Sequence, residues 1–338
     1  MKYVILNRPH ANSRYQEGVL RLSCAETANM LRRFGVDAPV DIVRRMGADF
    51  LEFEADALHE PLIRCLSAHS HLMLLFEGRE DGSLVPLAGQ RAPYLREDLP
   101  FVQKYKGKTN EAFTMHLINQ AHMASAFWQE ERLSLLDPMC GRGTTLFQAV
   151  NRGFCATGAE IHGAEAEECG AFFKRYLEFH HIKHSQKKRS LTLNGKGVPL
   201  NEFSFAGDAE AYKAGDVRTL QLLTCDSVNL QKLMPRTKYH LMVADLPSGV
   251  QHAPGAQGKR AAPFEETLEN NLRVWRELLL PGGAMALSFN VNTLPTARVR
   301  ELMERCGLLV CRGEGYDGLE HWVEQAITRD AAVAVRPA

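Results

Sequence analysis

The residues best suited to chemistry gather in one short stretch of the sequence, DPMCGRGTT (residues 137–145). It follows the apolar run LSLL and precedes the helix-like run LFQAVNRG, which predicts a turn between a strand and a helix. A phosphate-binding loop would need a lysine here, and a dinucleotide-binding turn would need a third glycine where Leu146 stands. A tight two-glycine turn beside Asp137 instead favours a ligand with a cationic amino-acid end.

Three further acidic residues stand at the ends of apolar, strand-like runs. Glu160 ends CATGAEI, where a carboxylate can accept both hydroxyls of a ribose. Asp226 in LLTCDSV is placed to accept from an adenine amino group, and Asp245 in HLMVADLPSG precedes a proline turn. Any one of them could be a solvated strand end or a helix N-cap. Together with Asp137, they favour a ligand site at one edge of a sheet.

The elements that position these residues begin at about residue 133. Strand-like runs separated mostly by helical segments follow in the order LSLLD, CATGAEI, LLTCDSV, HLMVADL, AMALSFN, LLVCRG and EQAITRD. This alternation predicts a doubly wound, Rossmann-like α/β domain over residues 126–338, with a mainly parallel sheet. Ligands of such sheets bind beyond the carboxyl ends of the strands.

The first part of the chain has a different pattern. Residues 1–90 predict the order strand, helix, one or two strands, helix, strand, which is typical of a small ferredoxin-like α+β domain. Residues 85–109 are rich in proline, glycine and charge and predict a connector. An apolar-faced helix, NEAFTMHLINQAHMASAFW, follows it, and we assign residues 91–125 to this connector and helix.

Composition restricts the class of protein and partner. The 338 residues include 40 Lys and Arg against 40 Asp and Glu, so any nucleic-acid-binding surface would have to be local. The sequence shows no run apolar enough for a signal peptide or a membrane span. Its eight cysteines form no C-x-x-C pair, and we expect reduced thiols in a cytoplasmic protein without a metal site. Nothing in the sequence indicates the oligomeric state.

The motifs DPMCGRGT, GAEI, CDS and DLPSG together resemble those of class I methyltransferases that use S-adenosylmethionine. DPMCGRGTT is most similar to the branch of RNA methyltransferases that act on the exocyclic amino group of guanine in tRNA and rRNA. The resemblance covers residues 105–330 well. Residues 1–76 are more faintly similar to the ferredoxin-like unit that precedes a THUMP domain in these enzymes. Only residues 77–104 separate the two regions, so a full THUMP domain does not fit.

The resemblance implies a set of cofactor-binding residues: Thr109, Asp137, Pro138, Cys140, Gly141, Gly143, Glu160, Ile161, Asp226 and Ser227. In the family, the DPMCGRG turn surrounds the methionine part, the acidic residue of GAEI binds the ribose, and that of CDS binds the adenine amino group. Thr109 belongs to YKGKTNEAFTMHLINQA, which is similar to the family segment that borders the cofactor pocket, as does its neighbour Asn110. Cys140 could also be a nucleophile, but no paired histidine is evident, which favours packing against the cofactor.

Four residues, Asp245, Leu246, Pro247 and Ser248, stand where the family has a catalytic Asp/Asn-Pro-Pro-aromatic motif. There the Asp245 carboxylate and the Leu246 carbonyl would accept from the amine, orient it, and stabilise its developing positive charge. The missing aromatic would have stacked on the target base, worth about 1–3 kcal/mol. Phe264 or Phe289 could replace it, which we prefer; otherwise the acceptor is not a flat base or activity is lost.

A basic stretch, residues 174–196, holds seven Lys or Arg and one Glu. It is a candidate phosphate-contacting patch of RNA-binding residues, with Lys183, Lys187, Lys188 and Arg189 as substrate contacts. The alternative is a solvated helix end followed by a charged loop. The length of the insertion over residues 185–219 favours a substrate-related loop. Three histidines in the stretch lack acidic or cysteine partners at metal-binding spacing.

These features favour an S-adenosylmethionine-dependent methyltransferase that acts on RNA, with the exocyclic amino group of a guanine in tRNA or rRNA as the first hypothesis. Within the same class, the acceptor could be DNA or protein. A non-catalytic RNA-binding protein that retains the cofactor fold is the alternative from another class, and the missing motif aromatic favours it.

Overall fold

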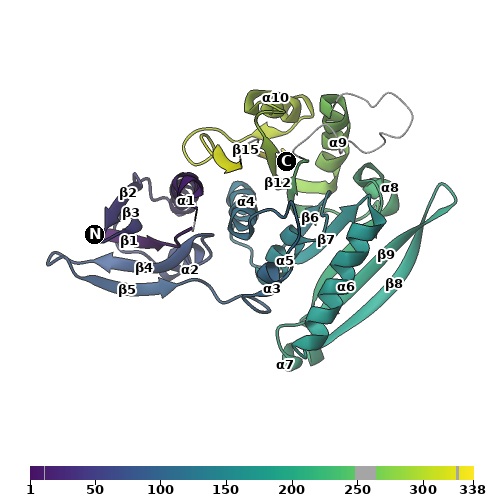
Figure 1. Ribbon diagram of the computed structural model, residues 1–338, viewed down its shortest axis with the longest axis horizontal. Helices are drawn as coiled ribbons and strands as arrows, with labels where there is room; N and C mark the ends of the chain where they lie inside the picture. The colour runs from purple at the N-terminus through teal and green to yellow at the C-terminus, as the bar shows by residue number, and fades with distance from the viewer. Residues whose placement is uncertain (11, 248–263, 325–326) are drawn as a thin grey trace.

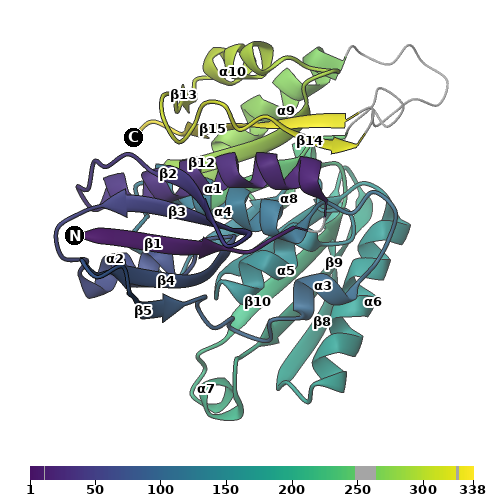
Figure 2. The same ribbon diagram turned by 60° about the vertical axis from the view of Figure 1, so that its left-hand side comes forward.

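Two β-sheets lie side by side, with α1 (Ser13–Arg33) and α4 (Glu111–Ala124) packed against each other between them (Figure 1). This computed structural model describes residues 1–10, 12–247, 264–324 and 327–338. The N-terminal sheet has five strands and the larger sheet has ten. Because α1 covers the smaller sheet and α4 the larger one, the two sheets share a helical layer (Figure 2).

The N-terminal sheet is antiparallel throughout, in the strand order β2-β3-β1-β4-β5. Its remaining elements are β1 (Lys2–Asn7), β2 (Asp41–Arg45), β3 (Ala48–Glu54), α2 (Glu60–Leu66), β4 (Leu72–Gly78) and β5 (Leu84–Gly89). Met46 and Gly47, between β2 and β3, both have positive φ, which a two-residue hairpin turn requires. Apolar residues of α1, such as Met30, are buried against Ile5 and Leu51 of the sheet.

The region between the two sheets is more regular than the sequence predicts. Residues 85–109 were expected to form a connector, but Leu84–Gly89 pair with β4 as strand β5. Pro86 obscured this strand in the sequence, and an edge strand tolerates the missing N–H of proline. A short helix, α3 (Leu99–Val102), follows before α4 begins. The Asn110 side chain accepts from the Phe113 N–H (3.0 Å), so this candidate cofactor contact caps α4.

The larger sheet has the order β13-β15-β12-β11-β6-β7-β10-β9-β8, and β14 pairs with β15. Its five central strands are parallel: β6 (Ser134–Asp137), β7 (Cys155–Glu160), β10 (Arg218–Thr224), β11 (Tyr239–Asp245) and β12 (Leu279–Asn290). Antiparallel pairing links β12 with β15 and β15 with both β13 and β14, in β13 (Leu309–Val310), β14 (His321–Glu324) and β15 (Ile327–Val335). The prediction of an α/β fold with a doubly wound sheet is therefore confirmed, with a mixed sheet.

Helices cover both faces of this sheet. Leu135 and Leu136 of β6 belong to different core clusters, because successive strand residues point to opposite faces. One cluster includes residues of α4, α5 (Thr144–Asn151) and α6 (Gly163–Phe179). The other includes residues of α8 (Leu230–Leu233), α9 (Phe264–Leu278) and α10 (Thr296–Arg305). The remaining short helices are α7 (Ala209–Lys213) and η1 (Ser227–Asn229).

The sequence analysis expected a loop over residues 185–219, but this insertion is not a loop. Its main part is a hairpin of β8 (His184–Leu193) and β9 (Lys196–Phe205), which extends the sheet beside β10. Asn194 and Gly195 have positive φ and form its two-residue turn. No residue of β8 is fully buried, and its charged and polar residues hid this strand. In β9, Val198 and Leu200 belong to one core cluster and Phe203 and Phe205 to the other, so the apolar residues follow no single alternation.

A buried polar network joins the two sheets through their shared helical layer. The Glu26 carboxylate of α1 accepts from Asn119 Nδ2 of α4 (2.7 Å), pairs with His116 Nδ1 (2.9 Å) and accepts from the Ser70 N–H (2.9 Å). Burial opposes ionisation of Glu26, but nearby His69 and the hydrogen bonds from His116 and Ser70 outweigh it and lower its pKa. Removing one partner from such a buried pair is strongly destabilising, so the network fixes how the two sheets meet.

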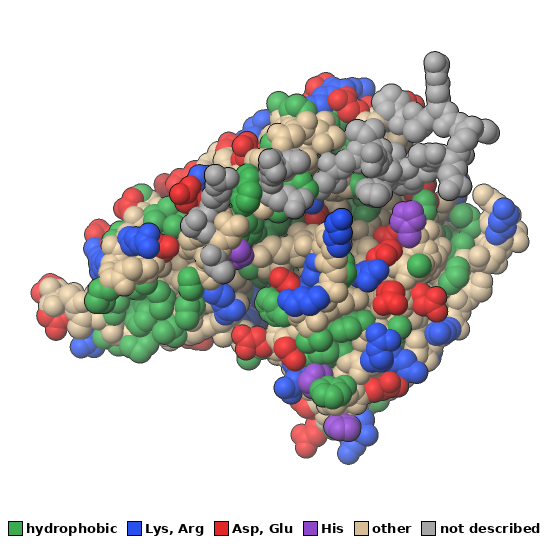
Figure 3. Space-filling view, in the orientation of Figure 1, with side chains coloured by type: hydrophobic (Ala, Val, Ile, Leu, Met, Phe, Trp, Pro, Cys, Tyr) green, Lys and Arg blue, Asp and Glu red, His purple; other side chains and the backbone are tan. Residues whose placement is uncertain are grey.

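Among the described residues, no helix is long and apolar enough to cross a membrane. On the face shown in Figure 3, Lys and Arg side chains are interspersed with Asp and Glu, in keeping with the balanced overall charge.

Candidate functional site

A cavity of about 610 Å³ opens at the carboxyl ends of β6 and β11. From β6 the chain winds outward to β7 and β10, then returns to β11 on the other side of β6. The cavity therefore lies at the point where the winding of the sheet reverses, the usual ligand site of such sheets. Its walls come from the connector before α4, the turn after β6, the end of β11, and β15.

The turn after β6 is held tightly against the strands behind it. The Gly143 N–H donates to the Cys140 carbonyl (2.8 Å), and the Cys140 N–H donates to the Ala159 carbonyl (3.0 Å). Gly143 has a φ of +91°, and a Cβ there would lie 2.5 Å from Cys169 Sγ. Only glycine can adopt this φ without strain and also leave room for the Cys169 side chain. Helix α5 begins directly after it.

Two buried carboxyls support this turn. Asp137 Oδ1 accepts from the Met139 N–H (3.0 Å). The Glu160 carboxylate accepts from the Gly141 N–H (2.9 Å) and the His162 N–H (2.8 Å). Burial, together with the nearby Glu160 and Asp245, raises the pKa of Asp137 to about 7 despite its hydrogen bonds. Asp137 lines the cavity, whereas Glu160 does not line it and supports the turn through its hydrogen bonds.

At the opposite wall, Asp245 has two partners. Its Oδ2 accepts from Thr109 Oγ1 of the connector (2.5 Å), and its Oδ1 forms an ion pair with Arg329 of β15. Arg329 also donates to Ser288 Oγ of β12 (3.2 Å). Sequence reasoning missed Arg329, because nothing in the run ITRD shows that β15 lies two strands from β11 in the sheet.

Tyr105 and Arg142 are two further cavity residues that sequence reasoning missed. The Tyr105 hydroxyl hydrogen-bonds with Thr144 Oγ1 (2.9 Å), and burial raises the pKa of Tyr105 to about 12. The Arg142 guanidinium lies 5.2 Å from the centre of the Tyr105 ring and pairs with Glu165 (2.6 Å). Tyr105 belongs to YKGKT, so its nearness to Thr109 in the sequence was the signal that could have found it.

The structure brings seven of the candidate site residues to this one cavity: Thr109, Asp137, Cys140, Gly141, Asp245, Leu246 and Pro247. Ser248 lies outside the described residues. Cys140 is buried, and burial raises the pKa of its thiol well above the ordinary value, which disfavours a thiolate nucleophile. Pro138 and Gly143 belong to the same turn without lining the cavity.

The other candidate cofactor residues do not line the cavity. Asp226 Oδ1 accepts from the Val228 N–H (3.1 Å) and caps η1, and the buried Ser227 hydroxyl accepts from Trp275 Nε1 (3.1 Å). Ile161 is exposed beyond the end of β7. Their roles toward a cofactor stay predictions, because the local contacts also give Asp226 and Ser227 structural functions.

The candidate substrate residues Lys183, Lys187, Lys188 and Arg189 are all exposed, and the last three lie on β8. Arg189 pairs with Glu202 of β9 (2.7 Å), which also lies opposite Lys187 in the hairpin. Glu202 therefore offsets part of the positive charge of this strand. In the described residues, no group of three or more His, Cys, Asp or Glu side chains could hold a metal ion.

One candidate for the missing aromatic is excluded by burial. Phe289 is 1% exposed inside the sheet core, so it cannot stack on an acceptor base. It lies on the buried run of β12, where its ring packs as an ordinary core residue. Phe264, at the start of α9, is partly buried against the same core.

No family model matches this chain, and no curated protein matches it. Among solved structures, a TehB-like SAM-dependent methyltransferase from Corynebacterium glutamicum is 14% identical, with 60% of this chain and 79% of that chain covered and a TM-score of 0.35. An rRNA methylase from Streptococcus thermophilus is 8% identical, with coverage of 69% and 100% and a TM-score of 0.35. An S-adenosylmethionine-dependent methyltransferase from Clostridium acetobutylicum is 9% identical, with coverage of 62% and 85% and a TM-score of 0.37. Similarities of this size do not show which substrate this chain acts on.

Proposed function

We propose that this protein is an S-adenosylmethionine-dependent methyltransferase that acts on the exocyclic amino group of a guanine in tRNA or rRNA. The observation that carries the proposal is the cavity at the reversal point of the sheet. It combines a buried carboxyl, Asp137, and an open glycine turn with a second acidic group, Asp245, on the neighbouring strand. This is the arrangement that a sulfonium cofactor and an amine acceptor would need to meet.

The chain fits the cofactor at the turn. A Cβ on Gly141 would meet nothing within 4 Å, so the backbone is open to a ligand. The Asp137 carboxyl, whose pKa is about 7, is ready to pair with an ammonium group, which would favour its ionised form. The first N–H groups of α5 can donate to a carboxylate. When bound, S-adenosylmethionine supplies an electrophilic methyl group, and we assign its ribose to Glu160 and its adenine to Asp226 and the neighbouring Ser227 and Ile161.

The residues at the end of β11 would hold the acceptor amine. The Leu246 carbonyl and a free lone pair of Asp245 would accept its two N–H groups and orient its nitrogen. Thr109 and Arg329 fix the carboxylate in one orientation. The Arg329 charge lessens the negative field at the amine, so Asp245 works here through orientation more than through charge. We therefore assign Arg329 as a positioning residue.

Tyr105 is the residue that best replaces the missing motif aromatic. It lines the cavity, and one side of its ring is already covered by the Arg142 guanidinium. A base in the cavity would stack on the other side of the ring, and stacking of this kind is worth about 1–3 kcal/mol. Tyr105 is preferred over Phe264 because it shares the cavity with Asp245.

The remaining assignments complete the proposal. Residues 1–90 form a ferredoxin-like domain, whose order β1-α1-β2-β3-α2-β4 and strand order support the assignment, with β5 added at its edge. Residues 91–125 connect it to the methyltransferase domain, residues 126–338. The exposed residues Lys183, Lys187, Lys188 and Arg189 would contact phosphates of the RNA.

A non-catalytic RNA-binding protein that retains the fold is the second candidate. The ion pair between Asp245 and Arg329 favours it, because it occupies part of the carboxylate that an amine would need.

The deciding experiment is methyl transfer from tritiated S-adenosylmethionine to tRNA, rRNA and DNA, followed by nucleoside analysis. Label in N2-methylguanosine of tRNA or rRNA supports the proposal. Label only in DNA changes the class of the acceptor. Cofactor binding without transfer to any acceptor supports the non-catalytic candidate.

A further inference from the structure

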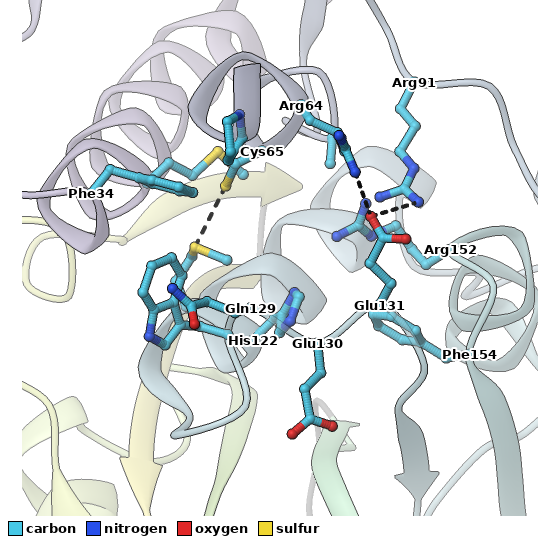
Figure 4. Close-up of a pocket in the computed structure, with 15 residues that line it drawn as sticks. Phe34, Arg64, Cys65, Arg91, His122, Gln129, Glu130, Glu131, Arg152 and Phe154 are labelled. Atoms are coloured by element: carbon cyan, nitrogen blue, oxygen red, sulfur yellow. Dashed lines mark hydrogen bonds and ion pairs between the residues drawn. The ribbon is translucent and has the colours of Figure 1, made fainter. Parts of the chain in front are cut away.

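A second set of cavities lies where the two sheets meet, apart from the cavity of the proposed active site. Three adjoining cavities of about 240, 360 and 290 Å³ share the side chains of Arg91 and Arg152. They are bounded by α1 and α2 of the N-terminal domain and by α4 and the loop after α5 of the larger one. Figure 4 shows the first of them, with three arginine side chains pointing toward one carboxylate.

The cations of these cavities are arginines: Arg8, Arg64, Arg91, Arg132, Arg152 and Arg218. We call this set the arginine groove. Arginine presents a planar fork of donors that matches phosphate oxygens in pairs, whereas lysine offers a point charge. The acidic side chains that line the same cavities are fewer, namely Glu97, Glu130 and Glu131, and Asp216 beside them pairs with Arg132 and Arg218.

At the centre of the groove, positive charge exceeds negative charge. Arg64 and Arg91 both pair with Glu131, at 3.5 and 3.7 Å. Nε and Nη1 of Arg152 are buried, and neither has a hydrogen-bond partner in the described part of the chain. Burial, and then the charge of Arg91, lowers the pKa of Arg152 to about 10, so it still carries its charge at neutral pH. The guanidinium lies over the Phe154 ring, 5.6 Å from its centre, which leaves these two buried N–H groups without an acceptor, and a bound anion would accept from them.

The groove continues toward the proposed active site. Phe101, 39% exposed in α3, lines the groove, and the connector that follows it contributes Lys104, Tyr105 and Thr109 to the active-site cavity. The two sites are therefore joined by one short segment of backbone. A polynucleotide lying along the groove would pass an exposed aromatic ring, a platform for a base, before it reached Asp245.

We propose that the arginine groove binds backbone phosphates of the nucleic-acid acceptor, centred on Arg91 and Arg152. This inference rests on the proposed function, because it names the docking surface of that same reaction. Glu131 would release Arg64 and Arg91 as phosphates replace it, and both arginines are exposed enough for this exchange to be easy.

The test compares the full-length protein with Arg91→Ala/Arg152→Gln, using a fluorescein-labelled tRNA transcript and a salt series. Losing two phosphate contacts should weaken tRNA binding about tenfold or more near 0.1 M salt and lower the log–log salt slope by about 1.5. KM for tRNA should rise while kcat and the affinity for S-adenosylmethionine are retained. Arg305→Ala, which removes an exposed arginine of α10 paired with Glu269, is the matched control and should change none of these.

Other outcomes are equally informative. A salt slope equal to that of the parent, or a parent protein that binds no tRNA, overturns the proposal. If the double variant loses binding of inorganic phosphate but not of tRNA, the groove is a small-anion site and the proposal is wrong. If the variant loses tRNA binding while the parent transfers no methyl group, the groove stands and the proposed function fails. Thermal melting of each variant, with Arg152→Lys as the conservative form, separates these results from unfolding, and Arg152→Lys should retain part of the affinity.

Discussion

Arg329 of β15 reaches across β12 to form an ion pair with Asp245 of β11. Ser288 of β12 lies between them and accepts from the same guanidinium (3.2 Å). Three adjacent strands thus contribute one row of polar side chains at the edge of the proposed active site. The row fixes the Asp245 carboxylate, since Thr109 holds its other oxygen. A carboxylate fixed on both oxygens needs no reorganisation when the acceptor gains charge.

Removing the Asp245 carboxylate should lower kcat strongly. We expect a loss on the order of a hundredfold for Asp245→Ala, by analogy with the loss of one preorganised hydrogen-bonding group. The Kd for S-adenosylmethionine should change far less, and Asp245→Asn should keep part of the activity because its amide oxygen still accepts. Single-turnover rates with saturating cofactor measure the effect. An unchanged rate for Asp245→Ala would show that the amine is oriented by other groups.

Arg329 should be coupled to Asp245 energetically. Arg329→Ala should lower kcat by less than Asp245→Ala does, because the carboxylate remains but loses its fixed orientation. In a double-mutant cycle, the combined variant should be no slower than Asp245→Ala alone, since both changes remove the same arrangement. Additive losses of rate would contradict the positioning role. Arg298→Ala, which removes an ion pair with Glu265 on α9, controls for the loss of a guanidinium.

Replacing Glu160 should affect both the cofactor and the turn that holds it. Glu160→Ala removes the acceptor of the Gly141 and His162 N–H groups and the proposed partner of the ribose. We expect the affinity for S-adenosylmethionine to fall by about 1–3 kcal/mol. Glu160→Gln keeps one carbonyl oxygen and should lose less. Calorimetry measures both, and unchanged affinity would place the ribose elsewhere.

The crowding at Gly143 should be visible in stability. Gly143→Ala places a methyl group 2.5 Å from Cys169 Sγ at a residue with a φ of +91°. Gly195→Ala, in the β8–β9 turn, has a φ of +77° but nothing within 4 Å of its Cβ, so it isolates the backbone strain. We expect about 1 kcal/mol of destabilisation for the control and about 2 kcal/mol more for Gly143→Ala. Equal urea midpoints for the two variants would show that the turn can relax.

The sequence predicted the order of most elements because each carried a clear hydrophobic period. Runs such as KYVILN and HLMVADL became strands β1 and β11. It failed for the β8–β9 hairpin, because β8 has no buried residue and the buried apolar residues of β9 change from one face to the other along the strand. It also missed Arg329 and Tyr105, because cavity walls built from separate strands and a connector depend on tertiary pairing that no local pattern records.

The stability of the protein should fall steeply in mild acid. Burial lowers the pKa of His71 to about 3, of His122 to about 3 and of His321 to about 4. Each of these histidines would take up a proton near pH 6.5 once unfolded, so the stability that each contributes is complete above pH 6.5 and is lost below it. Asp137 acts in the opposite direction, because its raised pKa of about 7 lets the folded state bind a proton that the unfolded state lacks. Between pH 4.5 and 6 these four groups therefore bind about two more protons in the unfolded state than in the folded state. The free energy of unfolding should fall by about 2.7 kcal/mol for each unit by which the pH is lowered.

Urea unfolding across this pH range tests the prediction. His122→Asn removes one of the three histidines and should reduce the slope by about 1.4 kcal/mol per pH unit. Asp137→Asn removes the opposing group and should make the slope steeper by a similar amount. A parent slope near zero would mean that the three buried rings become protonated in the folded protein, and that the helical layer between the two sheets opens to admit the charge.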